Sequence, residues 1–152
     1  MRKLFVILSV LIVAAGCSVD REERKKVVLE KIEAFEQEQW NELTQLILDN
    51  GYVNSHIGLY INPDELDGEL SQNLKEKGVI RLSVVDLADD CKEVEYSLDW
   101  TEYPIGSLYL TWSSCDSKQT KKGYYKDNFN INFIEVWGLG DNWSMWIDSD
   151  PL

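Results

Sequence analysis

The sequence has few of the residues from which metal centres and catalytic triads are built. His56 is the only histidine, so a histidine-based metal cluster is excluded and a histidine-dependent triad would rest on this one residue. We expect His56 to be a loop residue without a catalytic role. Glycine-rich phosphate loops, HExxH, the nucleophile elbow and CxxC pairs are all absent. We therefore predict no catalytic residue, no metal site and no cofactor, and an enzyme that uses acidic residues is the least favoured hypothesis.

Positive charge is also scarce. The chain has 15 Lys and Arg against 27 Asp and Glu, which gives a formal charge of −12. Such a chain is repelled by nucleic acid and by anionic lipid, so we exclude both as partners. A cationic protein partner is compatible with this charge. The acidity also keeps a domain soluble without any partner.

The only long apolar run is too short to span a bilayer. It extends from Leu4 to Ala15, is preceded by Arg2 and Lys3, and is followed by Gly16-Cys17-Ser18. Small residues before a cysteine at this place resemble the lipobox of bacterial lipoproteins, with Ala14 where the family prefers Leu. Two alternatives stay open: an ordinary cleaved signal that leaves Cys17 a free thiol, and an uncut hydrophobic anchor.

The lipobox resemblance implies where the protein is held. Residues 1–16 would be a signal peptide, and Cys17 would become an acylated, palmitate-type N-terminus on a charged stalk, residues 17–26. Several acyl chains, at about 0.8 kcal/mol per buried CH₂, anchor a protein stably in a bilayer. The implied location is the bacterial cell envelope, with the domain extracytoplasmic. Ser18 resembles the outer-membrane sorting pattern of cells with two membranes.

Residues 27–152 have the length of one domain, and they begin with a helical pattern. Removing the leader also removes Arg2 and Lys3, which moves the formal charge to −14. A helix capped by Asp20 is predicted to run to about Asp49, where Asn50-Gly51 is a stop signal. Gln39 interrupts its apolar stripe and indicates a break between Glu36 and Gln39. The stripe consists of Val28, Ile32, Phe35, Leu43 and Leu46.

A short helix and a series of strands follow. The short helix is predicted to begin at Asn62-Pro63 and end at Gly78, and residues 57–61 are a possible strand. From Val79 on, apolar residues alternate with polar ones in segments that contain Ile80, Leu82 and Val84, then residues 93–100, 108–113, 129–136 and 143–148. A β-bulge is expected near Phe133 and a turn at residues 138–142. The predicted fold is α+β: a long N-terminal amphipathic helix packed on a curved antiparallel meander of about four to five strands, plus one short helix.

Cross-strand pairing predicts a disulfide between Cys91 and Cys115. If the hairpin folds about Tyr103, Leu98 faces Leu108 and the other apolar residues also meet apolar partners on one face. The same register places Cys91 opposite Cys115, although the cysteines were not used to choose it. An extracytoplasmic compartment favours such a bond.

Two sets of side chains are candidate binding sites. The outward face of the predicted hairpin is acidic and carries an aromatic ring, which suits a cationic protein partner or simply a hydrated sheet face. Its members are Glu93, Glu95, Asp99, Tyr109 and Thr111. Three tryptophans, Trp137, Trp143 and Trp146, are candidates to line a sugar or small-molecule pocket, although such residues more often fill a core. The acidic groups at residues 64–69 and 86–90 do not have the spacing of an EF-hand and are expected to be solvated turns and helix starts.

The order of the predicted elements resembles the cystatin-like rolls, including the nuclear transport factor two-like group. In that family the sheet curls around the helix and leaves a conical pocket, and its members include enzymes and binding modules. The leading hypothesis is therefore an anchored, non-enzymatic binding module, in its sharper form an inhibitor or immunity-type protein for a cationic partner. The alternative is a small-ligand protein with tryptophans inside the roll.

Overall fold

The computed structural model describes residues 23, 25–99, 107–115, 121–127 and 134–148. The chain divides into two compact units, Met1–Phe35 and Glu36–Leu152. In the first unit, residues 25–33 are helical. The leader, Cys17 and the predicted cap Asp20 lie outside the described residues. All that follows concerns the second unit.

The predicted long helix is two helices. The chain leaves the helical conformation at Glu36 (φ −98°, ψ 88°), and α2 begins at Gln37 and ends at Leu48. Residues 36–39 offer no apolar side chain to bury, so nothing holds this segment on a continuous helical stripe. The break thus falls at the start of the predicted interval.

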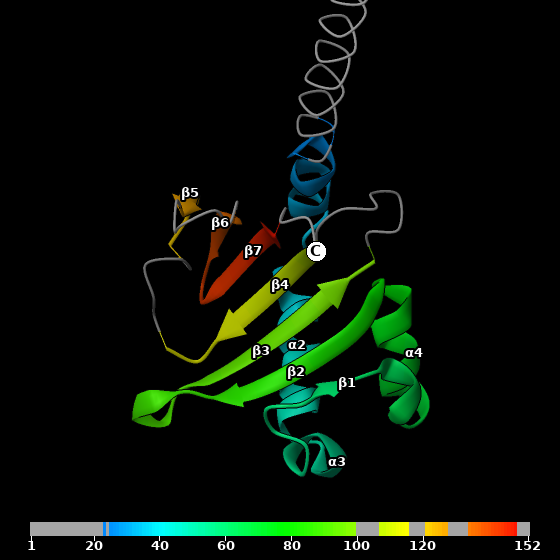
Figure 1. Cartoon of the computed structure of the whole chain (residues 1–152). Helices are drawn as coiled ribbons and strands as arrows, with labels where there is room; N and C mark the ends of the chain where they lie inside the picture. Colours follow the sequence, from blue (N-terminus) through cyan, green and yellow to red (C-terminus); the bar gives the residue numbers. More distant parts are fainter. Residues whose placement is uncertain (1–22, 24, 100–106, 116–120, 128–133, 149–152) are drawn as a thin grey trace, which may run out of the picture. The chain divides into compact units, whose positions relative to one another are not determined.

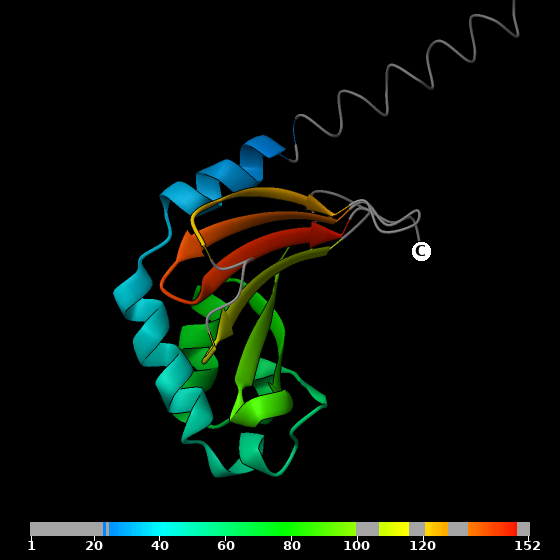
Figure 2. The ribbon, with the colours of Figure 1, turned by 90° about the vertical axis from the view of Figure 1, so that its left-hand side faces the viewer.

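Helix α2 buries one stripe along a face of the sheet (Figure 2). The buried residues are Trp40, Leu43, Thr44 and Ile47. Leu46 was expected in this stripe but is 54% exposed, and Thr44 takes its place at the interface. The Thr44 hydroxyl lies 2.7 Å from the hydroxyl of Tyr96 on the sheet, which satisfies both buried groups.

The stop signal after α2 also starts the next helix. Asn50 accepts hydrogen bonds from the backbone N–H groups of Tyr52 and Val53, and so caps α3 (Gly51–Asn54). The predicted short helix is a 3₁₀ turn, Pro63–Glu65, followed by α4 (Gly68–Glu76). The chain turns out of α4 at Gly78, whose φ of +73° suits glycine.

The described residues form one antiparallel sheet of seven strands rather than four to five (Figure 1). The strands are β1 (Tyr60–Ile61), β2 (Val79–Asp86), β3 (Lys92–Leu98), β4 (Ser107–Ser113), β5 (Gly123–Asp127), β6 (Ile134–Gly140) and β7 (Trp143–Asp148). Their order is β1-β2-β3-β4-β7-β6-β5, so the sheet is two meanders joined between β4 and β7 instead of one. The two edge strands were not predicted firmly. Strand β1 was left open and has only two residues, and β5 was missed because its sequence, Gly-Tyr-Tyr-Lys-Asp, has no apolar alternation.

The final hairpin is shifted from its predicted position. Gly138 and Gly140 belong to β6, and the turn consists of Asp141 and Asn142, both with positive φ. The expected bulge near Phe133 lies outside the described residues, and a register shift occurs between Gly138 and Gly140. A second shift lies between Val79 and Arg81. Val79 is buried there, and Ile80, which was expected on the buried face with Leu82, is 53% exposed.

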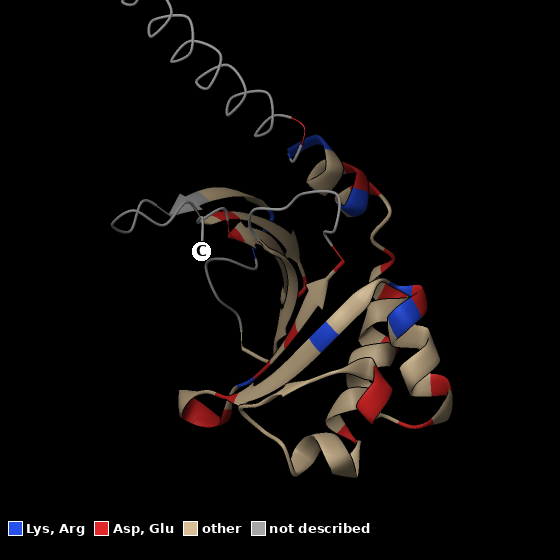
Figure 3. Cartoon of the chain, turned by 45° about the vertical axis from the view of Figure 1, so that its right-hand side comes forward, with Lys and Arg blue, Asp and Glu red and all other residues tan. Residues whose placement is uncertain are grey.

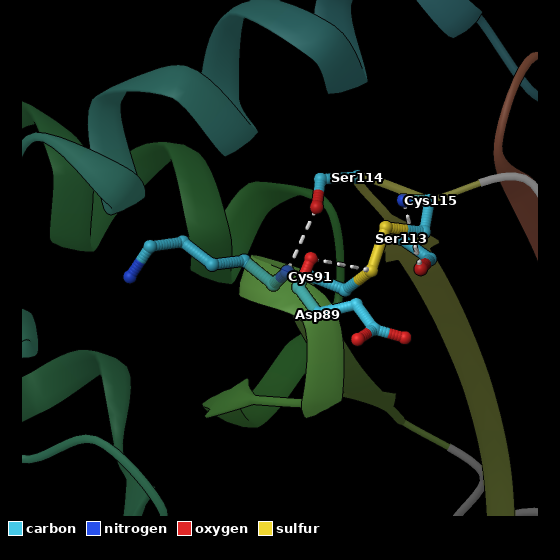
Figure 4. Close-up of a disulfide and its surroundings, with 6 residues drawn as sticks. Asp89, Cys91, Ser113, Ser114 and Cys115 are labelled. Atoms are coloured by element: carbon cyan, nitrogen blue, oxygen red, sulfur yellow. Dashed lines mark hydrogen bonds between the residues drawn. A yellow bond between two sulfur atoms is a disulfide. The ribbon is translucent and has the colours of Figure 1, made fainter.

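The predicted register of the central hairpin is confirmed. Leu98 pairs with Leu108 and Val94 with Trp112, although the predicted turn at Tyr103 lies outside the described residues. Beyond the last pair, Cys91 and Cys115 form the predicted disulfide, with Cα atoms 5.6 Å apart (Figure 4). Two hydrogen bonds of 2.8 Å lie at the same end of the hairpin. The backbone N–H of Ser114 donates to the Lys92 carbonyl, and the backbone N–H of Lys92 donates to the Ser114 hydroxyl.

Candidate functional site: the outer face of the sheet

The sheet has a core face and an outer face, which are defined by their relation to α2. Tyr96 and Trp143 pack against Trp40 of α2, with ring centroids 5.0 and 6.2 Å away, so their strand positions mark the core face. Because side chains alternate along a strand, Glu93, Glu95 and Ser97 of β3 point to the opposite, outer face. The cross-strand pairs place Tyr109 and Thr111 of β4 on that face as well.

Two rows of paired residues cross the outer face. One row contains Arg81, Ser97, Tyr109 and Trp146, from β2, β3, β4 and β7 in that order. The row beside it contains Tyr60, Ser83, Glu95, Thr111 and Ser144. We call these residues, together with Glu93, the outer-face cluster.

Ring stacking and hydrogen bonds fix the large side chains of this cluster. The Tyr109 and Trp146 rings stack at 4.0 Å with planes 16° apart, and the Trp146 indole N–H donates to the Thr111 hydroxyl at 2.9 Å. The Arg81 guanidinium lies over the Tyr60 ring at 4.3 Å. These contacts hold each side chain from two directions, so the cluster is ordered without any ligand.

Arg81 forms hydrogen bonds with two other members of its own row. Its Nε donates to the Ser97 hydroxyl at 3.0 Å and its Nη2 to the Tyr109 hydroxyl at 3.4 Å. Both acceptors are neutral, and within the described part of the chain no carboxylate lies within 4.0 Å of this guanidinium. The predicted acidic face therefore also contains a cation, on the β2 side of its carboxylates.

The two carboxylates of the cluster are half-buried. Burial raises the pKa of Glu93 above its ordinary value, and no described residue forms a hydrogen bond or a salt bridge with its side chain. Burial also raises the pKa of Glu95 and the nearby charge of Glu93 raises it further, while a 3.3 Å hydrogen bond from Tyr60 and the charge of Arg81 act in the opposite direction. Each carboxylate has lost part of its hydration without a full replacement.

Asp99 does not belong to this cluster. It follows the last residue of β3, is exposed, and donates its backbone N–H to the Gly78 carbonyl at 2.6 Å. Four of the five predicted surface residues are thus brought together, and Asp99 is not. Figure 3 shows a basic segment within β2, and acidic segments on the helices and at the 3₁₀ turn Ala88–Asp90 (η2) that follows β2.

The three candidate pocket tryptophans are divided between the two faces. Trp143 is fully buried on the core face and donates to Asn41 of α2 at 2.8 Å. Trp137 is buried on the core face beside Tyr124, at 5.3 Å between ring centroids. Trp146 alone of the three lies on the outer face, so the three rings do not line a common pocket.

The remaining candidates contact side chains and backbone of the neighbouring turns. His56 lies in the turn after α3, where its ring stacks on Tyr52 at 4.2 Å and its Nδ1 lies 2.8 Å from the Tyr52 carbonyl. Glu65 accepts hydrogen bonds from Asn62 and Tyr52, and the backbone N–H of Asn62 contributes most to lowering the pKa of Glu65. No group of residues suited to a metal ion occurs among the described side chains.

A polar groove of about 370 Å³ lies between α2 and α4. Gln39, Leu46, Asn73 and Lys77 are among its lining residues. Lys77 is occupied within the protein, because it donates to Gln39 at 2.7 Å and lies over the Trp40 ring. Two carboxylates, Glu42 and Glu76, also line the groove, and Glu76 accepts a hydrogen bond from Gln72 at 2.7 Å.

Sequence reasoning missed Arg81, Tyr60 and the outer position of Trp146. The alternation of Arg81 with Leu82 does indicate an outward side chain, but only the pairing of β2 with β3 puts it beside Ser97. Likewise, the pairing of β4 with β7 sets Trp146 against Tyr109. Residues 87–91 join β2 to β3 directly, but the pairing of these strands contains a register shift between Val79 and Arg81, and β4 and β7 are far apart in the sequence.

Comparison with protein families, curated proteins and solved structures finds no match in any of the three. In the part of the chain that the structure describes, no helix has both the length and the apolar character needed to cross a membrane.

Proposed function

We propose that this protein is a lipid-anchored, extracytoplasmic binding module that recognises a cationic protein through the outer-face cluster. The anchor rests on the lipobox-like sequence Ala14-Ala15-Gly16-Cys17 after an apolar run. The recognition surface rests on the geometry of β2, β3, β4 and β7. In this proposal the protein carries out no reaction. It acts by binding its partner and blocking the partner's activity, as an inhibitor or immunity-type protein does.

The observation that carries the proposal is the pair of half-buried carboxylates on β3. Glu93 and Glu95 are two residues apart on one strand, so both point to the same face, and burial raises the pKa of each. A carboxylate in water must lose hydration before it can bind a cation, whereas these two have already lost part of theirs. A Lys or Arg side chain that reaches them restores hydrogen bonds that the protein itself does not supply.

The overall charge supports the same partner chemistry. A domain with a formal charge of −14 after removal of the leader attracts basic proteins over distances of about a Debye length, roughly 8 Å at physiological ionic strength. This attraction raises the association rate, while the outer-face cluster supplies the local contacts.

A basic decapeptide tests the surface. We expect decalysine to bind the full-length chain in nonionic detergent, and Glu93→Gln with Glu95→Gln to weaken binding about tenfold at low salt. The matched control removes the same charge from exposed helical positions, Glu38→Gln with Glu69→Gln, and should weaken binding about twofold. Equal losses in the two double variants would show that decalysine senses only net charge, and the proposed surface would be wrong.

The anchor has its own test. We expect labelled palmitate to be incorporated into the wild-type chain in bacterial cells, and the protein to sediment with the membrane fraction. Cys17→Ala removes the acylation site and should abolish both the label and the sedimentation. A Cys17→Ala chain that still sediments with membranes would favour an uncut hydrophobic leader.

A further inference from the structure

The groove between α2 and α4 is lined by charges of both signs. Two carboxylates, Glu42 of α2 and Glu76 of α4, share it with the ammonium group of Lys77, the residue that follows α4. Neither carboxylate lies within 4.0 Å of the Lys77 ammonium. Opposite charges that line one groove without meeting each other can be joined by a ligand that carries one charge of each sign.

Lys77 is held in place and still has unused hydrogen-bond donors. Its ammonium donates to the Gln39 side chain at 2.7 Å and lies 5.2 Å from the centre of the Trp40 ring. Gln39 is itself held, because its amide donates to Glu36. An ammonium has three N–H donors, and within the described part of the chain only Gln39 accepts from this one. The remaining donors can bind an acceptor in the groove, and a carboxylate is the strongest acceptor for them.

The two carboxylates also have unused capacity. Glu42 is exposed and forms no hydrogen bond or ion pair with any described residue. Glu76 accepts one hydrogen bond, from Gln72 at 2.7 Å, and no described cation lies within 4.0 Å of it. A carboxylate has about four acceptor positions, so either residue can accept hydrogen bonds from an ammonium group in the groove.

The groove has an apolar wall and the volume of a small-ligand site. Leu43 and Leu46 line it from α2, and Leu46 is 54% exposed. An aliphatic group that packs against Leu46 removes apolar surface of both molecules from water. The volume of about 370 Å³ lies at the lower end of the range for ligand sites, roughly 300–1,000 Å³. It therefore suits a molecule of about the size of an amino acid.

We propose that this groove binds a free α-amino acid with an aliphatic side chain. The carboxylate of the ligand accepts hydrogen bonds from Lys77, and its ammonium donates to Glu42 or Glu76. The aliphatic side chain packs against Leu46. Such a ligand has no net charge, so the acidity of the chain neither attracts nor repels it, and recognition depends on these local contacts. The groove belongs to α2 and α4, so this site goes beyond the proposed function and does not involve the outer-face cluster.

The test uses leucine as the probe and the full-length ¹⁵N-labelled chain in nonionic detergent as the target. We expect the side-chain amide signals of Gln39 and Asn73 and the backbone amide signal of Leu46 to shift saturably with leucine. N-acetyl-leucine lacks the ammonium, leucinamide lacks the carboxylate, and glycine lacks the aliphatic side chain. Each of these analogues should bind about tenfold more weakly than leucine, because each loses one of the three contacts.

A lysine variant tests the contact with the ligand carboxylate. Lys77→Gln removes the positive charge and should weaken leucine binding about tenfold. The matched control is Lys121→Gln, which removes the same charge from an exposed residue outside the groove and should leave the affinity unchanged. The spectrum of each variant shows directly whether it folds.

A pair of double variants tests the contact with the ligand ammonium. Glu42→Gln with Glu76→Gln should weaken leucine binding about tenfold, whereas Glu38→Gln with Glu69→Gln, outside the groove, should not. Three outcomes overturn the inference: no saturable shift, an analogue that binds as tightly as leucine, or equal effects of a groove variant and its control. Decalysine binding is measured on another face, so each of these outcomes leaves the proposed function in place.

Discussion

The two faces of the sheet treat polar groups differently. On the core face, buried polar atoms have partners within the protein: Thr44 meets Tyr96, Trp143 donates to Asn41, and the buried carboxylate of Glu135 accepts from the Tyr124 hydroxyl. On the outer face, Glu93 is half-buried without a hydrogen bond or salt bridge from any described residue. The core face is complete by itself, whereas the outer face is ordered but leaves part of its hydrogen-bonding capacity to another molecule.

Aromatic residues show the same contrast. Trp143 and Tyr96 are fully buried on the core face, with centroids 6.3 Å apart, and they fill the space under α2. Trp146 and Tyr109 also stack, but Trp146 stays partly exposed. The first pair stabilises the fold, and the second provides a rigid surface. Mutations on the two faces should therefore separate stability from binding.

The largest expected difference is between two tryptophan truncations. Trp143→Ala removes a fully buried side chain and should lower the free energy of unfolding by about 3–5 kcal/mol. Trp146→Ala should cost about 1 kcal/mol, because this ring is partly exposed. Urea unfolding followed by circular dichroism measures both values. Equal losses would mean that the outer-face stack is part of the core.

The disulfide should have the next largest effect. Cys91→Ser with Cys115→Ser opens a loop of about 25 residues, and chain-entropy arguments give a loss of about 3–4 kcal/mol. The pairs from Glu93–Ser113 to Leu98–Leu108 should survive, because apolar side chains on the core face fix their register. Urea unfolding gives the loss, and cross-strand NMR contacts test the register. A register change would show that the disulfide, rather than the apolar pattern, sets the pairing.

The hydrogen bond between Thr44 of α2 and Tyr96 of the core face should contribute less to stability, and its loss should cost most when only one partner is removed. Thr44→Val leaves the buried Tyr96 hydroxyl without its partner and should cost about 1–3 kcal/mol. Adding Tyr96→Phe removes that unsatisfied group, so the double variant should regain much of the loss. A double-mutant cycle in urea measures the coupling, and additive losses would contradict a direct hydrogen bond.

The smallest predicted effect is a pH-dependent gain in stability when the two carboxylates of the outer face are removed. Burial raises the pKa of Glu93 and Glu95 in the folded state, so folded protein holds these protons more tightly than unfolded protein. Their contribution to stability is therefore present at low pH and is lost as pH rises through the raised pKa values. Glu93→Gln with Glu95→Gln should stabilise the domain by about 0.5 kcal/mol or less at pH 7, and the gain should vanish at pH 3. Urea titrations at the two pH values check this, and a loss at pH 7 would contradict the burial argument.

Local sequence patterns predicted the central strands of the sheet. The rest of the sheet depends on pairing between strands that are distant in the sequence, which these patterns do not predict. The alternation of Val94, Tyr96 and Leu98 against Leu108, Leu110 and Trp112 determined one register, and that register alone located the disulfide. Strand β7 was also predicted at its observed bounds. By contrast, the edge strand β5 has no apolar alternation and was missed, and the edge strand β1, left open as a possible strand over residues 57–61, has only two residues.

The candidate site was predicted in part for the same reason. Glu93, Glu95, Tyr109 and Thr111 belong to one hairpin, so their common face follows from its register. Arg81 lies beside a register shift in the pairing of β2 with β3, and Trp146 belongs to a strand far from β4 in the sequence, so their contacts with Tyr109 require the folded sheet. Trp143 and Trp146 lie three positions apart on β7, so their side chains are on opposite faces of the sheet. The folded sheet shows that Trp146 is the one on the outer face.

The most direct test of the central claim is to map decalysine onto the two faces by NMR of the full-length chain in nonionic detergent. We expect the largest amide shifts at Glu93, Glu95 and Thr111, and only small shifts in α2 and at the core-face residues Tyr96 and Leu110. Largest shifts on the carboxylates of α2 and α4 would contradict it, because binding would then follow the general acidity of the chain and the outer face would not be a recognition surface.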